Sequence, residues 1–394
     1  MFICIAGKNN IAVDVLRYIL SINIDAQIGV VCNKSDTGKN TWQKSLRWFA
    51  NKWGVKEYLL EEIYDIEDLV FLSLEYDRII NPDKFNDARL YNIHFSMLPS
   101  YKGMYTSVFP ILNGEETVGV TFHKIDSGID TGDIIAQKSF SLNNQSCREV
   151  YHEFIRYGTE LVISYLNDVI KNTVVSFVQP SKNSSYYSKH SIDYNNMLLD
   201  IYQTSENISR QIRAFNFREY QLLAFNGKSV ISSRITNIKS TQKPGSVIFE
   251  NEYCVMISTI DYNTVLFYDR FAELMKACEE GDVEKVQEIC NVREHINEKN
   301  NKGLTPLMVA TINNNIGIVK FLISLGADIY ATNNIGKNLL MYAKEAYLRF
   351  GDNTLIKLYK TMGLSEYAED YYGNNLLFYM EKDGIPNPFS EIME

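Results

Sequence analysis

Short apolar segments alternate with amphipathic helical patterns from the first residues of the chain. The apolar segment 2–6 precedes a turn, after which apolar pairs recur every four residues over 11–20. Further apolar segments follow at 27–32 and 69–74, with a helical stripe over 42–53 between them. Because parallel strands are joined by crossovers that are usually helical, this alternation predicts an α/β fold with a doubly wound, largely parallel sheet.

The composition of the whole chain narrows the class of protein. With 394 residues, 45% of them hydrophobic, the chain is expected to form two or three globular domains. The formal net charge of −9 argues against a general nucleic-acid binder, because contacts to phosphates require an excess of Lys and Arg. The six cysteines lie at least twelve positions apart and form no C-x-x-C pair, so we expect neither a zinc site nor a redox pair. No stretch of about 18 uncharged apolar residues occurs, which predicts a cytoplasmic protein without a membrane segment.

The turn after the first apolar segment lacks the features of a dinucleotide site. Its sequence is Gly7-Lys8-Asn9-Asn10, without the later glycines that let a pyrophosphate approach the backbone, so we do not expect NAD or FAD here. Lys8 and the backbone amides at the start of the following helix could still bind a phosphate or an anionic sugar group. An ordinary tight turn is an equally good interpretation.

Two later strands are followed by polar residues, where doubly wound folds keep their sites. The predicted strand 88–94 contains Asn92 and His94, which point to the same side because they are two residues apart. A second polar segment, 126–133, follows another predicted strand and contains Asp130. An amide donor, an imidazole and a carboxylate together suit acyl transfer, although a histidine at a strand end is more often structural.

An ordered set of short motifs surrounds these residues. Asn-x-His is followed by Ser-x-Leu-Pro-x-Tyr-x-Gly at 96–103, Asn-Gly-Glu at 113–115, Gly-Val-Thr-x-His at 119–123 and Asp-x-Gly at 130–132. The set resembles the formyltransferase family, whose members take a formyl group from 10-formyltetrahydrofolate. The resemblance implies that Asn92, His94 and Asp130 are the catalytic residues and that 10-formyltetrahydrofolate is the co-substrate. No cluster of ligand residues in the sequence implies a metal.

The same resemblance assigns two binding regions. Residues expected at the folate pocket are Tyr76, Asp77, Arg78, Ile80, Asp126, Ser127 and Gly128. Residues expected to contact the acceptor substrate are Lys8, Asn9, Asn10, Glu75, Met97, Tyr101, Lys102, Gly103, Arg213, Phe215, Asn216 and Tyr220. Glu75 could meet an ammonium group or be solvated at its strand end, and Ile80 could equally belong to the core. The last four residues could instead form a helix end packed on a subdomain core.

Members of this family formylate methionyl-tRNA, a glycinamide ribonucleotide or an amino sugar carried on a nucleotide. The first turn and the segments 74–77 and 101–103 most resemble the nucleotide-sugar N-formyltransferases. This resemblance implies a dTDP-linked amino-deoxy sugar as the acceptor, of the 3-amino-3,6-dideoxyglucose type, for O-antigen or another surface polysaccharide. A 4-amino-4,6-dideoxyglucose acceptor is the alternative. The resemblance to this family also implies that the protein forms a homodimer.

The periodicity changes after about residue 270. Positions 33 residues apart match in the pairs Leu274 and Leu307, Met275 and Met308, Ala277 and Ala310, Val286 and Val319, and Gly303 and Gly336. This pattern resembles ankyrin repeats, of which about three and a partial cap fit, at 271–300, 301–333 and 334–370. The expected organisation is therefore a catalytic domain at 1–185, a small mainly-β subdomain at 186–268 and all-α repeats at 269–394.

The role of the repeats stays open at this stage. Ankyrin arrays usually bind proteins, so a protein partner, a dimer contact and a stabilising cap are all possible. The aromatic residues toward the C-terminus could form a second site for a nucleotide sugar, with packing of the cap as the simpler explanation. Residues 269–394 contain 13 Lys and Arg against 19 Asp and Glu, which argues against a tRNA acceptor. The alternative to an enzyme is an interaction protein that binds partners through its ankyrin repeats and has an inactive transferase domain.

Overall fold

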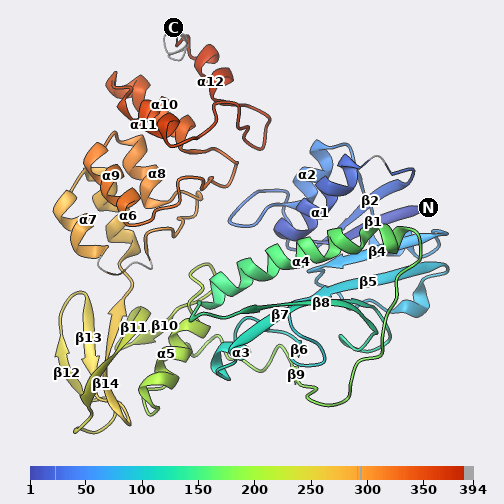
Figure 1. Cartoon of the computed structure of the whole chain (residues 1–394), viewed down its shortest axis with the longest axis horizontal. Helices are drawn as coiled ribbons and strands as arrows, with labels where there is room; N and C mark the ends of the chain where they lie inside the picture. The colour runs from blue at the N-terminus through green and yellow to red at the C-terminus, as the bar shows by residue number, and fades with distance from the viewer. Residues whose placement is uncertain (23, 291, 293–294, 386–394) are drawn as a thin grey trace. The chain divides into compact units, whose positions relative to one another are not determined.

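The structure is a computed structural model that describes residues 1–22, 24–290, 292 and 295–385 (Figure 1). The chain divides into two compact units, of which the first comprises residues 1–39 and 44–268 and the second residues 40–43 and 269–394. Each unit contains its own clusters of buried apolar side chains. Among the described helices, none is long and apolar enough to cross a membrane.

A seven-stranded sheet forms the centre of the first unit, with the strand order β3-β2-β1-β4-β5-β7-β8. Its strands are β1 (Phe2–Gly7), β2 (Gln27–Cys32), β3 (Lys56–Glu57), β4 (Leu69–Leu74), β5 (Ala88–His94), β7 (Thr117–Lys124) and β8 (Ile134–Ser141). The first five run parallel, whereas β7 is antiparallel to both β5 and β8. β1 and β4 are buried along their whole length, which explains their unbroken apolar sequences. The predicted largely parallel sheet is confirmed.

The strand order reverses between β1 and β4, and this reversal positions the site. Gly7 lies beside Leu74 in the register of these strands, and Leu74 lies beside Ile93 of β5. A Cβ atom on Gly7 would lie 1.9 Å from the carbonyl oxygen of Leu74, so glycine is required for the two strands to approach. Ligands of doubly wound folds bind at such a reversal, outside the carboxyl ends of the strands.

Three helices pack with this sheet, of which α4 is the longest (Figure 1). They are α1 (Asn9–Ser21), α2 (Leu46–Lys52) and α4 (Cys147–Ile170). A capping box starts α4, because the hydroxyl of Ser146 accepts from the amide of Glu149 while the Glu149 carboxylate accepts from the amide of Ser146 at 2.7 Å. Within α4, a Cβ on Gly158 would lie 3.0 Å from Ile11 and 3.3 Å from Phe95, so this glycine lets α4 pack closely on α1 and on the end of β5. The short helices η1 (Leu60–Ile63) and η2 (Pro82–Lys84) flank β4 in sequence.

A small subdomain completes the first unit. Its five-stranded antiparallel sheet has the order β10-β11-β14-β13-β12. Its strands are β10 (Leu223–Phe225), β11 (Lys228–Lys239), β12 (Val247–Glu250), β13 (Cys254–Ile257) and β14 (Tyr262–Tyr268). The helix α5 (Ser205–Ala214) buries Ile208 and Ile212 in the same cluster as Leu266. The short helix α3 (Phe109–Leu112) and the paired strands β6 (Lys102–Gly103) and β9 (Tyr186–Tyr187) lie in the connections.

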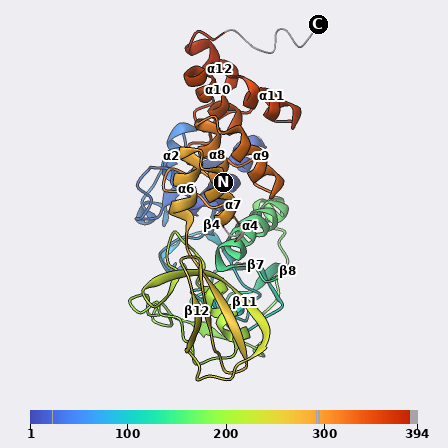
Figure 2. The same cartoon turned by 90° about the vertical axis from the view of Figure 1, so that its left-hand side faces the viewer.

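The second unit consists of helices arranged in successive pairs (Figure 2). They are α6 (Phe271–Glu280), α7 (Val283–Ile289), α8 (Pro306–Ile312), α9 (Ile316–Ser324), α10 (Leu339–Phe350), α11 (Thr354–Thr361) and α12 (Leu376–Lys382). α8 and α10 begin 33 residues apart, whereas α10 and α12 begin 37 apart, because α10 is five residues longer than α8 and α11 is one residue shorter than α9. Thr305, Asn338 and Asn375 each cap the next helix by accepting from an amide three residues on. The predicted all-α repeat region is confirmed.

Candidate active site

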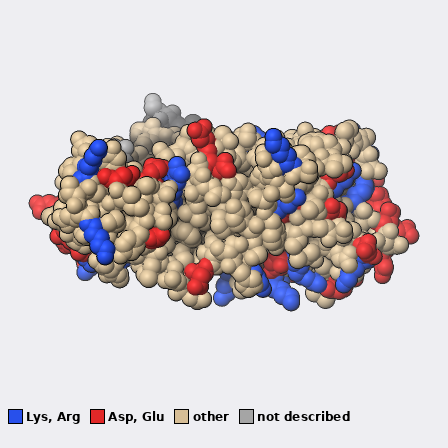
Figure 3. Space-filling model, turned by 90° about the horizontal axis from the view of Figure 1, so that it is seen from below, with Lys and Arg blue, Asp and Glu red and all other residues tan. Residues whose placement is uncertain are grey.

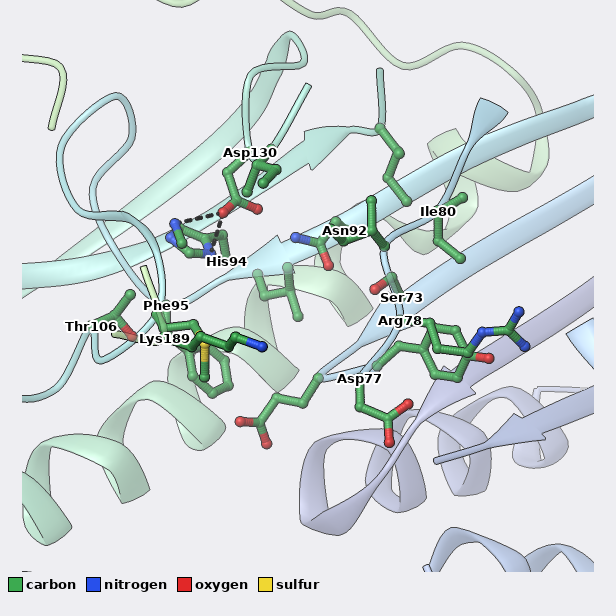
Figure 4. A pocket seen from close by; sticks show the side chains of 18 of the residues that line it. Ser73, Asp77, Arg78, Ile80, Asn92, His94, Phe95, Thr106, Asp130 and Lys189 are labelled. Carbon is green, nitrogen blue, oxygen red and sulfur yellow. Dashed lines mark hydrogen bonds and ion pairs between the residues drawn. The ribbon is translucent and has the colours of Figure 1, made fainter. Parts of the chain in front are cut away.

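A cavity of about 840 Å³ opens at the carboxyl ends of β4 and β5, beside the strand reversal (Figure 4). Its walls come from the ends of these strands, from Lys8 before α1, from the loop after β7 and from two segments near 103–106 and 186–190. Ligand-binding cavities usually measure about 300–1,000 Å³, so this one has room for a large organic ligand.

Asn92, His94 and Asp130 converge on this cavity, as Figure 4 shows. His94 Nε2 lies 2.8 Å from the carbonyl oxygen of Tyr101, so this nitrogen carries the hydrogen and donates it. The other ring nitrogen, Nδ1, lies 3.5 Å from Oδ2 of Asp130. The side chains of His94 and Asp130 are 9% and 14% exposed, so water screens little of the electrostatic interaction between them. The structure therefore brings the three predicted catalytic residues together.

His123 of β7 is a fourth member of this polar cluster. In the antiparallel register it lies directly opposite Asn92, and the two side chains are joined by a hydrogen bond of 3.0 Å to His123 Nε2. Its Nδ1 donates to the carbonyl of Lys124 at 2.7 Å, which leaves Nε2 of the neutral ring as the acceptor from Asn92. Burial lowers the pKa of His123 despite the attraction of Asp130, so the ring is neutral near pH 7. A neutral His123 therefore fixes the amide of Asn92 with its Nδ2 pointing toward the cluster.

The loop that carries Asp130 is held in an uncommon backbone conformation. Asp130 itself has φ of 53°, and its Oδ2 accepts from the amide of Gly103 at 2.9 Å. The side chain of Gln179 donates to the carbonyl oxygens of Asp130 and Gly132 at 2.9 and 2.8 Å. A Cβ on Gly132 would lie 1.9 Å from the carbonyl oxygen of Lys124, which gives the Asp-x-Gly motif a physical reason. The loop thus presents Asp130 to His94 in one fixed orientation.

Most of the residues predicted for the folate pocket line one part of the cavity. The lining residues are Tyr76, Asp77, Arg78, Ile80, Asp126 and Gly128, and only Ser127 is not among them. Ile79 and Ile129 also line this part, with 77% and 40% of their surfaces exposed. Polar groups therefore surround an accessible apolar surface, which suits a flat heterocycle with a polar edge. Their assignment to folate stays a prediction.

The residues predicted for the acceptor substrate are divided by the structure. Lys8, Glu75 and Gly103 line the cavity, and Asn9 donates a hydrogen bond to the carboxylate of Glu75. The residues that do not line it are Asn9, Asn10, Met97, Tyr101, Lys102, Arg213, Phe215, Asn216 and Tyr220. Asn10 Oδ1 instead accepts from the amide of Lys44 at 3.1 Å. The backbone carbonyl of Tyr101 accepts the hydrogen bond from His94, and the ring of Tyr101 stacks on that of Tyr187 with the ring centroids 5.7 Å apart.

The four predicted residues around the end of α5 have partners within the first unit. Phe215 packs on the apolar cluster of the subdomain, and the side chain of Asn216 donates to the carbonyl of Ile231 at 3.0 Å. Nη2 of Arg213 lies 3.9 Å from Oε1 of Glu206, and the side chain of Tyr220 is 57% exposed. Their contact with a nucleotide stays a prediction. The structure shows the alternative arrangement, in which the end of the helix packs on the core of the subdomain.

Several residues of the site were not singled out in the sequence. His123 was visible only as the last residue of the Gly-Val-Thr-x-His motif, while Tyr151, on α4, donates to Glu75 at 2.7 Å. Tyr105 and Lys189 line the cavity and are joined by a bond from the Tyr105 hydroxyl to the Lys189 carbonyl at 2.9 Å. The polar, tyrosine-rich composition of 181–188 was the available signal for this last wall.

The sheet, the cavity at its strand reversal and the cluster of amide, imidazole and carboxylate define an α/β enzyme suited to acyl transfer. The sequence profile of the family described as formyl transferase matches residues 9–164. The chain belongs to the formyltransferase family, as its motifs predict, and it is a formyl-transferring enzyme. A profile of ankyrin repeats in three copies matches residues 274–357, which confirms that prediction as well.

Two solved structures are similar to the first unit. The sugar 3N-formyl transferase WlaRD, crystallised in the presence of dTDP and 5-N-formyl-THF, is 42% identical, with a TM-score of 0.64 and coverage of 68% of this chain and 98% of that one. The N-formyltransferase from Helicobacter canadensis, in complex with folinic acid and dTDP-3-aminofucose, is also 42% identical, with a TM-score of 0.63 and coverage of 68% and 99%. The methionyl-tRNA formyltransferase of Fervidobacterium nodosum is 27% identical over 227 residues, which cover 55% of this chain and 72% of that one.

Proposed function

We propose that this enzyme transfers the formyl group of 10-formyltetrahydrofolate to the amino group of a dTDP-linked 3-amino-3,6-dideoxy sugar. The observation that carries the proposal is the convergence of Asn92, His94 and Asp130 on one cavity at the strand reversal. The choice of this acceptor is supported by the similarity of the chain to two enzymes crystallised with thymidine diphosphate ligands and formyl-folates. The sequence identity to each is 42% over nearly its whole length.

The residues of the cluster have distinct tasks in such a transfer. 10-Formyltetrahydrofolate supplies an electrophilic formyl carbon, and the amine of the acceptor is the nucleophile. The amide NH₂ of Asn92 has two hydrogens and uses one toward His123, so the other can donate to the negative charge that develops on the formyl oxygen. The Nδ1 of His94 carries a lone pair and can take a proton from the attacking nitrogen, while Asp130 stabilises the resulting imidazolium.

The wall that contains Ile79, Ile80 and Ile129 fits the heterocycle of the folate. These side chains offer an apolar face, and Tyr76, Asp77 and Asp126 offer polar groups around it. Arg78 also lines the cavity, and its Nη2 lies 2.8 Å from Oε1 of Glu61. On this arrangement we place the formyl group next to Asn92 and His94, which line the same cavity.

A nucleotide sugar suits this chain better than a tRNA. Residues 269–394 carry six more Asp and Glu than Lys and Arg, because 19 acidic residues face 13 basic ones, and such a unit repels a polyanion. On the face shown in Figure 3, Lys and Arg side chains are interspersed with Asp and Glu. Lys8 and Lys189 line the cavity and supply enough positive charge for a diphosphate but not for a long phosphate backbone.

The decisive experiment is an assay with purified protein, 10-formyltetrahydrofolate and a panel of dTDP-linked 3-amino and 4-amino sugars. Mass spectrometry should show the gain of one formyl group on a 3-amino sugar, with release of tetrahydrofolate. Formylation of a 4-amino sugar alone would overturn the choice of acceptor, and formylation of methionyl-tRNA alone would overturn the proposal. The homodimer, the cytoplasmic location and the use of the product in O-antigen or another surface polysaccharide stay predictions.

A further inference from the structure

Glu75 occupies a specialised position beside the catalytic cluster. It follows the last residue of β4, and the register that pairs Leu74 with Ile93 places Glu75 level with His94 on the neighbouring strand. Its φ is 58°, a left-handed conformation that is unfavourable for a residue with a Cβ atom. The carboxylate lines the cavity at the point where the chain makes this bend. A strained backbone at a ligand cavity is a common mark of a functional residue.

One oxygen of this carboxylate is fixed by the protein and the other is available to a ligand. Oε2 accepts hydrogen bonds from the hydroxyl of Tyr151 at 2.7 Å and from the side-chain amide of Asn9. Asn9 is only 1% exposed, and Asn33 donates to the backbone carbonyl of Glu75 at 2.9 Å. Among the described residues, none donates a hydrogen bond to Oε1 of Glu75. The free oxygen therefore has a defined position in the cavity.

The charge of Glu75 depends on opposing influences. Burial raises the pKa of Glu75, whereas the hydrogen bond from Tyr151, the charge of Lys8 and the hydrogen bond from Asn9 lower it. Tyr151 and Lys8 are the titratable groups that act on it, from α4 and from the turn before α1. A partly buried carboxylate attracts a cation more strongly than an exposed carboxylate does, because less water screens the attraction.

The amine acceptor poses a chemical requirement that the cluster of Asn92, His94 and Asp130 does not meet alone. A primary aliphatic amine is protonated at neutral pH, as the lysine side chain is, and an ammonium nitrogen has no lone pair for attack. One proton must leave before the C–N bond forms, and a second must leave the nitrogen after it forms. His94 is placed to take one of these protons, so a second acceptor is needed.

We propose that Glu75 binds the ammonium group of the acceptor and takes its first proton. This inference rests on the proposed function. An N–H bond of the ammonium breaks and an O–H bond forms on the Glu75 carboxylate, which leaves a neutral amine with its lone pair free to attack the formyl carbon. His94 then takes the second proton from the attacking nitrogen and donates it to the folate nitrogen as the bond from the formyl carbon to that nitrogen breaks, which releases tetrahydrofolate. The proton on Glu75 passes to solvent. Asn9 and Tyr151 are positioning residues, because they act on the carboxylate and not on the substrate.

The test is the pH dependence of kcat/KM for Glu75→Gln. The amide keeps the shape but neither attracts an ammonium nor accepts its proton, so kcat/KM at pH 7 should fall about 100-fold. The ratio of wild type to variant should shrink as the pH rises toward the pKa of the substrate amine, because the neutral amine then needs no acceptor. A ratio that stays constant with pH would overturn the inference, since a purely structural role affects both forms of the substrate equally.

A binding measurement separates this inference from the proposed reaction. By calorimetry without folate, the wild-type enzyme should bind a dTDP-linked amino sugar at least about 10-fold more tightly than the analogue with a hydroxyl in place of the amine. Glu75→Gln should lose this preference while it still binds the hydroxyl analogue. Equal preference in both proteins would overturn the role of Glu75, whereas absence of formyl transfer by the wild type would overturn the proposed function alone.

Tyr151→Phe tests the positioning role. Loss of its hydrogen bond raises the pKa of Glu75, so the acid limb of the kcat/KM profile should move to higher pH. An unmoved limb would contradict this role. The matched control is Glu160→Gln, also on α4, which removes a surface pair with Lys138 at 2.6 Å and should leave the whole profile unchanged. Circular dichroism and thermal melting of all variants establish that each is folded.

Discussion

The two units of the molecule differ in where the backbone takes left-handed conformations. In the first unit, non-glycine residues with positive φ include five at or beside the cavity, namely Asn9, Glu75, Tyr101, Tyr105 and Asp130, with φ between 53° and 61°, while Asp68 and several asparagines have positive φ elsewhere. In the described part of the repeat unit, positive φ falls on glycines, with Asn314 as the exception. Glycine adopts this conformation without a steric penalty, whereas other residues lose about 1–2 kcal/mol.

The comparison indicates two ways in which a sequence specifies structure. The repeats place a glycine or a capping residue wherever the backbone requires one, so the local sequence and the fold agree there. The cavity instead keeps strained residues in place through hydrogen bonds between distant segments, such as the bond from Gly103 to Asp130. Substitutions in the two units should therefore have different consequences: loss of chemistry in the first and loss of local stability in the second.

The largest effect is expected for His94→Asn. Asparagine can still donate to the carbonyl of Tyr101 but cannot carry a proton, so kcat/KM should fall about 1,000-fold. Steady-state kinetics measures the loss, and thermal unfolding should be unchanged for both units. Rates close to those of the wild type would remove His94 from the catalytic group.

In the repeats, Leu307→Ala is expected to lower the stability strongly without a loss of catalysis. Leu307 is 1% exposed in the apolar cluster of the second unit, so the cavity left by the truncation should lower the free energy of unfolding of that unit by about 3 kcal/mol. Formyl transfer at 25 °C should continue. Leu348→Ala is the control, because this side chain is 50% exposed and its truncation should change stability by less than about 0.5 kcal/mol. Loss of activity that parallels the loss of stability would contradict the independence of the units.

The stability of the first unit should decrease as the pH falls, because of His123. An unfolded imidazole has a pKa of about 6.5, and burial lowers the pKa of His123 in the folded state. The unfolded chain then binds more protons, so the contribution is fully present above about pH 6.5 and is lost as the pH falls through the folded pKa, at about 1.4 kcal/mol for each pH unit. His123→Asn should flatten this dependence in thermal unfolding between pH 7 and pH 5. The exposed His190→Asn should leave the slope as it is, and an unaltered slope in His123→Asn would refute the assignment.

The smallest effect is expected when the repeats are removed altogether. A chain that ends at Tyr268 keeps the sheet, the cavity and the subdomain with their own cores, so kcat/KM should stay within about threefold of the full-length value. Steady-state kinetics on the truncated protein measures this. A folded truncated protein that no longer binds the nucleotide sugar would assign part of the acceptor site to the repeats.

Much of this architecture could be predicted from local patterns. The apolar strands around residues 2–6 and 69–74 and the 33-residue spacing from Leu274 to Leu307 are periodic signals, and both correspond to elements of the structure. The cluster of Asn92, His94 and Asp130 could be predicted because its motifs keep a fixed order along the chain. The residues after α5 were harder to interpret, because a cation, aromatic rings and an amide also suit a packed helix end, as the bond from Asn216 to Ile231 shows.

The periodic parts of this protein follow from its sequence alone, because strands, helices and repeats leave a signal within a few turns of the chain. The direct contacts between the polar side chains of the site become apparent only in the folded structure. His123 meets Asn92 through the register of β5 and β7, and Glu75 meets Asn9 and Tyr151 across 66 and 76 positions. Such contacts depend on how elements distant in the sequence pack together, so no local pattern records them.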